Sequence, residues 1–227
     1  MRLTRRNFLG TSAAAAVALS PGLLLAAPAA KAPMSADEAL SRLMDGNKRY
    51  IAGKTVHGNL TARRDEVAPK QQPFAMVLSC ADSRVPPELI FDETLGALFV
   101  VRVAGNYAET GGIGSFQYAF EHFHSPLLLV LGHSACGAVH ATVDAMKDPN
   151  ASAPGDIAAI VNAIMPSVKK VANTSGDIYA AAIAQNARDN AGKLAAEPLL
   201  HTGVAEHRLR VASAVYDLQS GRVSLLT

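Results

Sequence analysis

The chain has 227 residues, of which 49% are hydrophobic and 18% charged, which suits one globular domain and excludes a disordered protein. Its formal charge is +2, and the three arginines among its first nine residues exceed that surplus. Without them the balance is slightly negative, so composition does not indicate a nucleic-acid or anionic-membrane partner.

Residues 1–29 predict an export signal rather than part of the fold. Arg5-Arg6 is followed by Phe8-Leu9, a pairing that resembles a twin-arginine signal. An Ala-rich stretch comes next and ends in Ala27-Pro28-Ala29, small residues typical of a cleavage site. The stretch is shorter and less hydrophobic than a usual transmembrane anchor. We therefore expect the twin-arginine translocation machinery to export the chain, leaving residues 30–227 as one periplasmic domain without stable membrane insertion.

The first element expected in the mature chain is a helix. Ser35-Ala36-Asp37-Glu38 forms a capping box, and hydrophobic residues recur after it at helical spacing until Gly53, a plausible stop. A polar link from Lys54 to Lys70 follows. The hydrophobic stripe of this helix suits either the sheet of its own chain or a second subunit, and its sequence does not decide between them.

Strands and helices then alternate, which predicts an α/β fold with a mostly parallel central sheet flanked by helices. The near-continuous hydrophobic character of the strands indicates burial on both faces. Strands are expected at 74–79, 98–103 and 127–131, and helices at 86–91, 111–123 and 136–147. The remainder is expected to form helices at 157–171 and 178–194, an edge strand at 211–218 and a hairpin return at 222–226.

Two short motifs follow two of the expected strands: Cys80-x-Asp82-x-Arg84 and His133-x-x-Cys136. Because ligands lie at the carboxyl ends of strands in an open parallel sheet, we expect two thiols and one imidazole to converge at one edge. Two Cys and one His form a zinc ligand set that leaves a fourth position open, as catalytic sites do. The sequence therefore predicts an enzyme with catalytic Zn²⁺ held by Cys80, His133 and Cys136.

Asp82 and Arg84 predict a catalytic dyad beside the metal. A bidentate pair with Arg84 would keep Asp82 ionised. The carboxylate could then accept a hydrogen bond from a hydroxide on the zinc ion and orient it toward a substrate. If the pair broke, Asp82 could occupy the open metal position and switch the enzyme off.

These two motifs, Cys-Ala-Asp-Ser-Arg-Val and His-Ser-Ala-Cys-Gly-Ala, resemble those of the β-class carbonic anhydrases, and the resemblance extends from about Ser35 to Leu226. It implies reversible hydration of CO2 to bicarbonate and a proton, with one zinc ion per subunit. It also implies a homodimer, or a dimer of dimers, in which the N-terminal helix packs on its partner. The substrate pocket of the family falls here on Gln71, Phe99, Tyr118 and Gly137.

The sequence departs from the family at two places. Ala104 stands where a pocket Val is common, and Val77 stands where one branch of the family has the Trp of a regulatory bicarbonate site. The second departure favours a resting state in which Asp82 and Arg84 are paired. Two alternatives stay open: the same site could hydrolyse CS2 or COS, or Cys80 and Cys136 could form a disulfide in a non-catalytic periplasmic protein.

Overall fold

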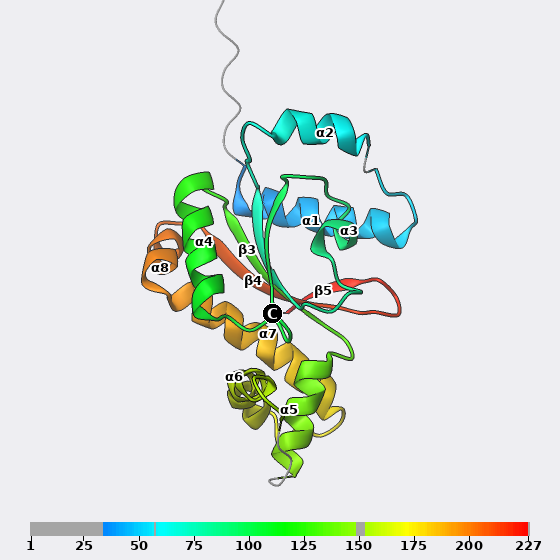
Figure 1. Ribbon diagram of the computed structural model, residues 1–227, viewed down its shortest axis with the longest axis vertical. Helices are drawn as coiled ribbons and strands as arrows, with labels where there is room; N and C mark the ends of the chain where they lie inside the picture. The colour runs from blue at the N-terminus through cyan, green and yellow to red at the C-terminus, as the bar shows by residue number, and fades with distance from the viewer. Residues whose placement is uncertain (1–33, 57, 149–152, 227) are drawn as a thin grey trace, which may run out of the picture. The chain divides into compact units, whose positions relative to one another are not determined.

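One five-stranded sheet organises the computed structural model, which describes residues 34–56, 58–148 and 153–226. The strand order is β2-β1-β3-β4-β5 (Figure 1). The first four strands run parallel, and β5 runs antiparallel to β4. The strands are β1 (Ala75–Ser79), β2 (Leu98–Arg102), β3 (Leu127–His133), β4 (Arg210–Tyr216) and β5 (Val223–Leu226).

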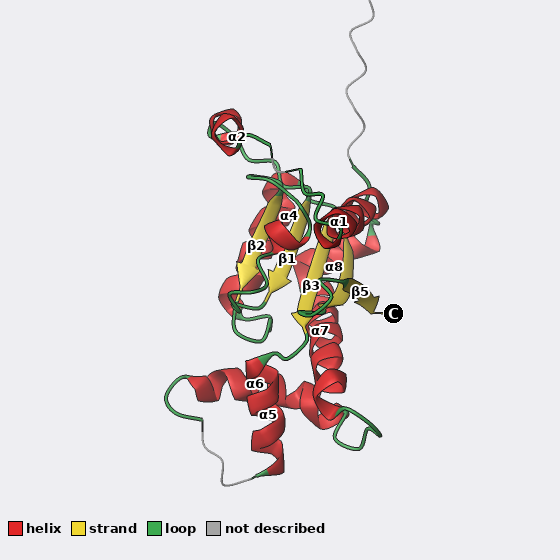
Figure 2. Cartoon of the chain, turned by 90° about the vertical axis from the view of Figure 1, so that its right-hand side faces the viewer, coloured by secondary structure: helices red, strands yellow, loops and turns green. Residues whose placement is uncertain are grey.

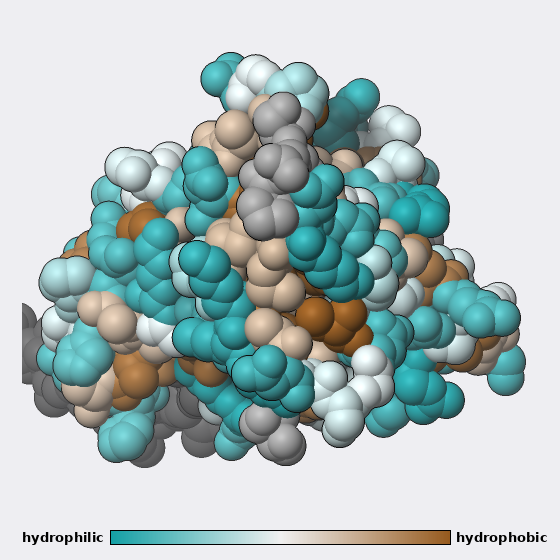
Figure 3. Space-filling model, turned by 90° about the horizontal axis from the view of Figure 1, so that it is seen from below, coloured by the Kyte–Doolittle hydropathy of each residue, from teal (hydrophilic) through white to brown (hydrophobic). Residues whose placement is uncertain are grey.

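Helices cover both faces of this sheet, and α5 and α6 lie beyond the ends of its strands (Figures 1 and 2). Seen from that end, the surface is mostly hydrophilic, with small separate hydrophobic areas (Figure 3). The helices are α1 (Ala36–Ile51), α2 (Leu60–Val67), α3 (Pro87–Ile90), α4 (Thr110–Phe123), α5 (Gly137–Lys147), α6 (Ile157–Lys170), α7 (Ile178–Ala196) and α8 (Pro198–Ala205).

Successive residues of the central strands point to opposite faces and build two separate cores. Ala75 and Val77 of β1 pack in a core with α1 and α3, whereas Met76 and Leu78 pack in a second core with α4 and α8. Every residue of β1 and β3 is buried. The prediction of strands buried on both faces is thus confirmed for β1 and β3, and it explains their near-continuous hydrophobic sequence, whereas no residue of β2 is fully buried.

Helix α1 begins at the predicted capping box. The Ser35 side chain accepts a hydrogen bond from Glu38 N, and the Glu38 carboxylate accepts one from Ser35 N. Of the two alternatives for its hydrophobic stripe, the structure has the first: Leu43 is fully buried in the core of its own sheet. The expected packing of this helix on a dimer partner stays a prediction. Gly46 allows the close approach, since a Cβ there would lie 1.8 Å from Phe91 O.

The polar link from Lys54 to Lys70 contains helix α2 (Leu60–Val67), which was not predicted. Asn59 caps it by accepting hydrogen bonds from Thr61 N and Ala62 N. None of its residues is buried, so it has no hydrophobic stripe from which periodicity could have predicted it.

Strand β4 lies inside the sheet, between β3 and β5, so the prediction of an edge strand at 211–218 is wrong. The edge on this side is the hairpin return, β5. Helix α8 was not predicted either; Pro198 begins it at a position where the missing N–H costs nothing.

The predicted export signal, residues 1–29, lies outside the described residues. Within the described ranges, no helix combines the length and hydrophobicity that a membrane span requires.

The strand order creates a topological switch point between β1 and β3. The chain leaves β1 toward β2 on one side, and it leaves β3 toward β4 on the other. At such a switch point the loops diverge, and ligands bind outside the carboxyl ends of the two strands. Cys80 directly follows β1, and His133 ends β3.

Candidate metal centre

Three donor side chains meet at this switch point, at the carboxyl ends of β1 and β3. The Sγ atoms of Cys80 and Cys136 and a ring nitrogen of His133 lie within 4.8 Å of one another. Their approach follows from the register, which pairs Ser79 with Leu131 and thus aligns the ends of β1 and β3. All three residues are buried, with at most 4% exposure. The predicted convergence of two thiols and one imidazole is therefore present in the structure.

The loop between the last two donors turns back on itself. Ala135 adopts a left-handed conformation, with φ of 53°. Ser134 anchors the loop to β4, since its N–H donates to Tyr216 O and its hydroxyl accepts from Leu218 N, both at 2.9 Å. This reversal brings Cys136, at the start of α5, back beside His133.

The imidazole of His133 presents one nitrogen without a protein partner. Its Nδ1 lies 2.9 Å from Ser134 O, and because a carbonyl only accepts, Nδ1 carries the proton. Nε2 is buried and makes no hydrogen bond. A buried lone pair is costly to leave unpaired, and a neutral imidazole fixed in this way is a common metal ligand.

The two thiols are free and strongly coupled. Their Sγ atoms are 4.0 Å apart, well beyond the ~2.05 Å of a disulfide bond. The hydrogen bond from Cys136 is the main cause that lowers the pKa of Cys80, and the Gly105 N–H at 3.2 Å lowers it further. The pKa of Cys136 is raised, because its proton bridges to Cys80 and burial opposes a second thiolate. A divalent cation in place of that proton would hold both sulfurs as thiolates.

These donors fit a zinc ion. Two thiolates and one imidazole are a usual zinc set, and three protein ligands leave one position for solvent or substrate. The unpartnered Nε2 of His133 and the paired sulfurs are what such an ion would satisfy. The donor set therefore supports the predicted ligand roles of Cys80, His133 and Cys136.

Asp82 and Arg84 form the predicted pair. Arg84 Nε donates to Asp82 Oδ1 at 2.9 Å, and an Arg84 terminal nitrogen donates to Oδ2 at 2.7 Å. The Arg84 side-chain hydrogen bond is the main cause that holds the pKa of Asp82 well below its usual range. The carboxylate side chain is 19% exposed and that of Arg84 58%, so the ionised pair lies at the rim of the site. This is the paired arrangement expected from the sequence, in which Val77 replaces the Trp of the regulatory bicarbonate site.

Sequence reasoning missed two groups that support the ligand loops. Arg102, at the end of β2, donates to the carbonyl oxygens of Cys80 and Asp82. Gly105 donates its N–H to Cys80 Sγ. The sequence gives no clear signal for Arg102, because it is an exposed residue that ends a partly buried strand. The role of Gly105 depends on a tertiary approach that the sequence does not reveal.

The predicted substrate residues do not all lie at this site. Gly137 does: it begins α5 directly after Cys136, and a Cβ there would meet nothing within 4 Å. Phe99 pairs with Met76, which is four residues before Cys80. It therefore lies about 13 Å from the level of Cys80, toward the amino ends of the strands. Gln71 is exposed and precedes the amino end of β1.

Tyr118 lies with Phe99 near that opposite end. The Tyr118 side chain is on α4 and the residue is 52% exposed; its ring contacts the rings of His122 and Phe123. The Phe123 ring in turn lies 6.0 Å from that of Phe99. Within one chain, then, Gln71, Phe99 and Tyr118 are gathered away from the Cys-His-Cys group.

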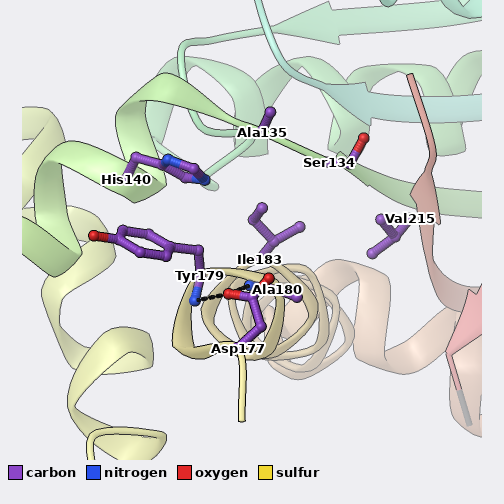
Figure 4. Close-up of a pocket in the computed structure, with 8 residues that line it drawn as sticks. All are labelled: Ser134, Ala135, His140, Asp177, Tyr179, Ala180, Ile183 and Val215. Carbon is purple, nitrogen blue, oxygen red and sulfur yellow. Dashed lines mark hydrogen bonds between the residues drawn. The ribbon is translucent and has the colours of Figure 1, made fainter. Parts of the chain in front are cut away.

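A cavity of about 270 Å³ lies behind the ligand loop (Figure 4). Ser134 and Ala135 form one wall, and residues of α7 form the other. His140 stacks on Tyr179 there, with ring centroids 4.3 Å apart, and Tyr179 donates its hydroxyl hydrogen to Asp144. The cavity is distinct from the metal site, since the three donor side chains do not line it.

The chain resembles known proteins along most of its length. The sequence profile of the family described as carbonic anhydrase matches residues 75–223. A carbonic anhydrase of Mycolicibacterium smegmatis is 35% identical over 188 residues, which are 81% of this chain and 89% of that protein. Carbonic anhydrase 2 of Mycobacterium tuberculosis is 41% identical over 128 residues, 56% of this chain and 61% of that protein.

Solved structures share the fold. One of two tetrameric β-carbonic anhydrases of Sordaria macrospora superposes with a TM-score of 0.66 at 22% identity, covering 71% of this chain and 84% of that one. The Coccomyxa β-carbonic anhydrase, solved with acetazolamide, gives 0.63 at 23% identity, covering 82% and 86%. The chain therefore belongs to the carbonic anhydrase family, and its fold is that of the β-class enzymes.

Proposed function

We propose that this protein is a zinc enzyme that reversibly hydrates CO2 to bicarbonate and a proton. The single observation that carries the proposal is the buried Cys80–His133–Cys136 group, whose donor atoms lie within 4.8 Å of one another. Family membership gives the reaction, and the donor set gives the metal.

Bound at these three residues, Zn²⁺ would supply a hydroxide nucleophile at neutral pH. Asp82, kept ionised by Arg84, would accept a hydrogen bond from that nucleophile and orient it toward CO2. Arg102 keeps the turn from Cys80 to Asp82 in place through its two carbonyl contacts. The open space at Gly137 leaves room for the substrate beside Cys136.

Stopped-flow CO2 hydration with a pH indicator tests the activity, together with metal analysis of the purified protein. We expect turnover with one zinc ion per chain. Zinc-free protein, or zinc-loaded protein inert toward CO2, would contradict the proposal. Turnover of COS or CS2 in place of CO2 would favour the alternative hydrolase.

A homodimer would complete the site. Gln71, Phe99 and Tyr118 lie far from the metal centre of their own chain, and the exposed Tyr118, beside the half-buried Phe99, offers aromatic surface for a neighbouring molecule. We expect a second copy to bring these residues against CO2. Helix α2 has no buried residue and is available for the same contact.

Mixed dimers test this shared site. An Asp82→Ala chain and a Phe99→Ala chain are each impaired alone. If Asp82 and Phe99 of one site come from different chains, a mixed dimer contains one intact site, and mixing restores activity. If both come from one chain, mixing restores nothing. Sedimentation of the wild-type protein gives the oligomeric state as a check.

We also propose export to the periplasm by the twin-arginine machinery, supported by Arg5-Arg6 and the small residues at 27–29. That route carries folded proteins, so the metal could occupy both thiols before export. Replacing Arg5 and Arg6 by lysine should keep the protein in the cytoplasm. Intact mass of the exported protein separates the alternatives: a two-proton loss without zinc would indicate a Cys80–Cys136 disulfide.

A further inference from the structure

A stripe of polar side chains on α7 forms hydrogen bonds to the loop between β2 and α4. Asn186 Nδ2 donates to Gly105 O at 2.8 Å, and Asn190 Oδ1 accepts from Ala108 N at 2.7 Å. Lys193 Nζ donates to Ala108 O at 2.7 Å. The spacing of 186, 190 and 193 puts all three on one face of the helix.

The buried amides of this stripe can be oriented in only one way. Asn190 must turn its oxygen toward Ala108, because a backbone N–H only donates. Its Nδ2 then donates to Asn186 Oδ1 at 3.0 Å and to Asn186 O at 2.8 Å. Asn186 is left with its own Nδ2 facing Gly105 O. The two side chains form one relay whose direction is fixed.

Burying two amide side chains costs free energy, so their presence here calls for a functional reason. Asn186 is fully buried and Asn190 is 7% exposed, on a helix whose neighbouring Ala187, Ala191 and Leu194 pack in the core. Buried amides add no hydrophobic stabilisation and must be fully paired. Asn190 Nδ2 bonds to Asn186 within the helix, whereas Asn190 Oδ1 and Asn186 Nδ2 both bond to the loop.

The loop that they hold contacts a metal ligand. Gly105 N–H donates to Cys80 Sγ at 3.2 Å, and Gly105 has a left-handed φ of 79°. Below it, Ile164 and Ala138 leave no room for a side chain: a Cβ at Gly105 would lie 2.5 Å from Ile164 Cδ1. The direction of this N–H thus depends on the conformation of the Gly105 backbone. Asn186 holds that backbone in place through its hydrogen bond to the Gly105 carbonyl oxygen.

We propose that Asn186 and Asn190 are positioning residues of the metal centre, which act through Gly105 on the Cys80 thiolate. An N–H donated to a ligating sulfur fixes the side chain and withdraws part of the charge that the sulfur gives to the cation. Loss of the relay would let Gly105 turn away and leave Cys80 held by one bond fewer. The inference rests on the metal binding proposed above but not on CO2 turnover.

The test measures metal binding directly. Zn²⁺ affinity is obtained by competition with a chelating indicator, and the Co²⁺-substituted protein reports its thiolate ligands through the sulfur-to-cobalt charge-transfer absorption. We expect Asn186→Ala to raise the dissociation constant for Zn²⁺ by about ten-fold and to shift or weaken that absorption. Asn190→Ala should act similarly, and the double variant should be no worse than the stronger single one, because the amides act as one unit.

A matched control separates this role from a general loss of stability. Ser125 is fully buried and donates to Pro73 O, near the amino end of β1. Ser125→Ala removes a comparable hydrogen bond far from the ligands and should leave both metal readouts unchanged. If Ser125→Ala alters them as Asn186→Ala does, the effect is merely structural and the proposal is overturned.

Lys193→Met supplies a variant that folds even if Asn186→Ala does not, since Lys193 is exposed. It releases Ala108 O and should weaken Zn²⁺ binding in the same direction, by about two- to five-fold, below the effect of the buried amides. Wild-type affinity and an unchanged cobalt spectrum in Lys193→Met and in any folded Asn186→Ala protein would overturn the proposal. If the wild type itself bound neither ion, the proposed function would fail and this inference with it.

Discussion

Arg102 donates a hydrogen bond from Nε to the carbonyl oxygen of Cys80 at 2.8 Å, and its terminal nitrogen reaches Asp82 O. One side chain thereby holds both ends of the turn that carries a metal ligand and the catalytic carboxylate. We expect Arg102→Met to lower kcat/KM for CO2 by about ten- to a hundred-fold, because outer-shell partners of metal sites have effects of this size. Zinc stoichiometry should stay close to that of the wild type.

Arg42 is the matched control for this experiment. It pairs with Glu93 and lies over the ring of Phe74, away from the ligand loops. Arg42→Met removes the same charge and should leave kcat/KM unchanged. Equal losses of activity in the two variants would show that Arg102 acts through the overall fold.

Asp82→Ala should keep the metal and lose most activity. The carboxylate is not among the three donors, so zinc content should be unaffected. Loss of the group that orients the nucleophile should reduce turnover by about a hundred-fold or more. Stopped-flow rates and metal analysis of the same preparation check both parts. Full activity in this variant would remove Asp82 from the mechanism.

Cys136→Ser should cost metal and stability together, since metal binding is coupled to folding. For the wild type, free Zn²⁺ at about a thousand times its dissociation constant stabilises the fold by about 4 kcal/mol. Chelator should therefore lower the Tm of the wild type and leave that of Cys136→Ser unchanged. An equal drop in both proteins would mean that the chelator acts elsewhere.

Two glycines on helices should respond to alanine in opposite ways. At Gly46 a Cβ would lie 1.8 Å from Phe91 O, so Gly46→Ala should destabilise the protein by about 1–3 kcal/mol. At Gly114, inside α4, nothing lies within 4 Å, and Gly114→Ala should stabilise it by about 0.5–1 kcal/mol. Urea unfolding gives both values, and a stabilising Gly46→Ala would contradict the close packing of α1 on α3.

Asp189 should contribute to stability in a pH-dependent way. Burial raises its pKa, but hydrogen bonds from Lys170, Ser167 and Gln185 outweigh burial and leave the pKa below the usual 3.8. A lowered folded-state pKa stabilises the protein above about pH 4, and this contribution is lost as the pH falls through the folded value.

Comparison with Asp189→Asn isolates this contribution. The difference in unfolding free energy between wild type and variant should be largest near pH 6 and should shrink below pH 4. Metal loss in acid affects both proteins and cancels in the comparison. A difference that grew as the pH fell would reverse the sign argued here.

The sequence predicted those parts of the fold that depend on local pattern. The hydrophobic runs gave β1 and β3 because both are buried on both faces, and each donor motif directly follows or ends its strand. Helix α2 escaped prediction because its first residue, Leu60, is 51% exposed and no member of it is buried, so no periodicity marks it. The place of β4 inside the sheet depends on a partner strand that its own sequence does not specify.

The site was predictable where each donor motif follows or ends a predicted strand, and not where the contact depends on distant side chains. Cys80, His133 and Cys136 were expected together and are together. The contact of Gly105 with Cys80 depends on α7 side chains more than eighty positions away. Gln71, Phe99 and Tyr118 came from family resemblance, and one chain does not bring them to the metal centre, so their role stays a prediction.

Because of the strand order, a metal ion bound at this site would also cross-link two distant segments of the chain. Cys80 and His133 lie at the ends of the neighbouring strands β1 and β3, yet β2 and α4 come between them in the chain. An ion bound by both residues closes a loop of roughly fifty residues. It thereby reduces the conformational entropy that this loop would gain if the two strands separated. Amide hydrogen exchange across β2 and α4 should therefore slow when the ion is present, well outside the coordination sphere.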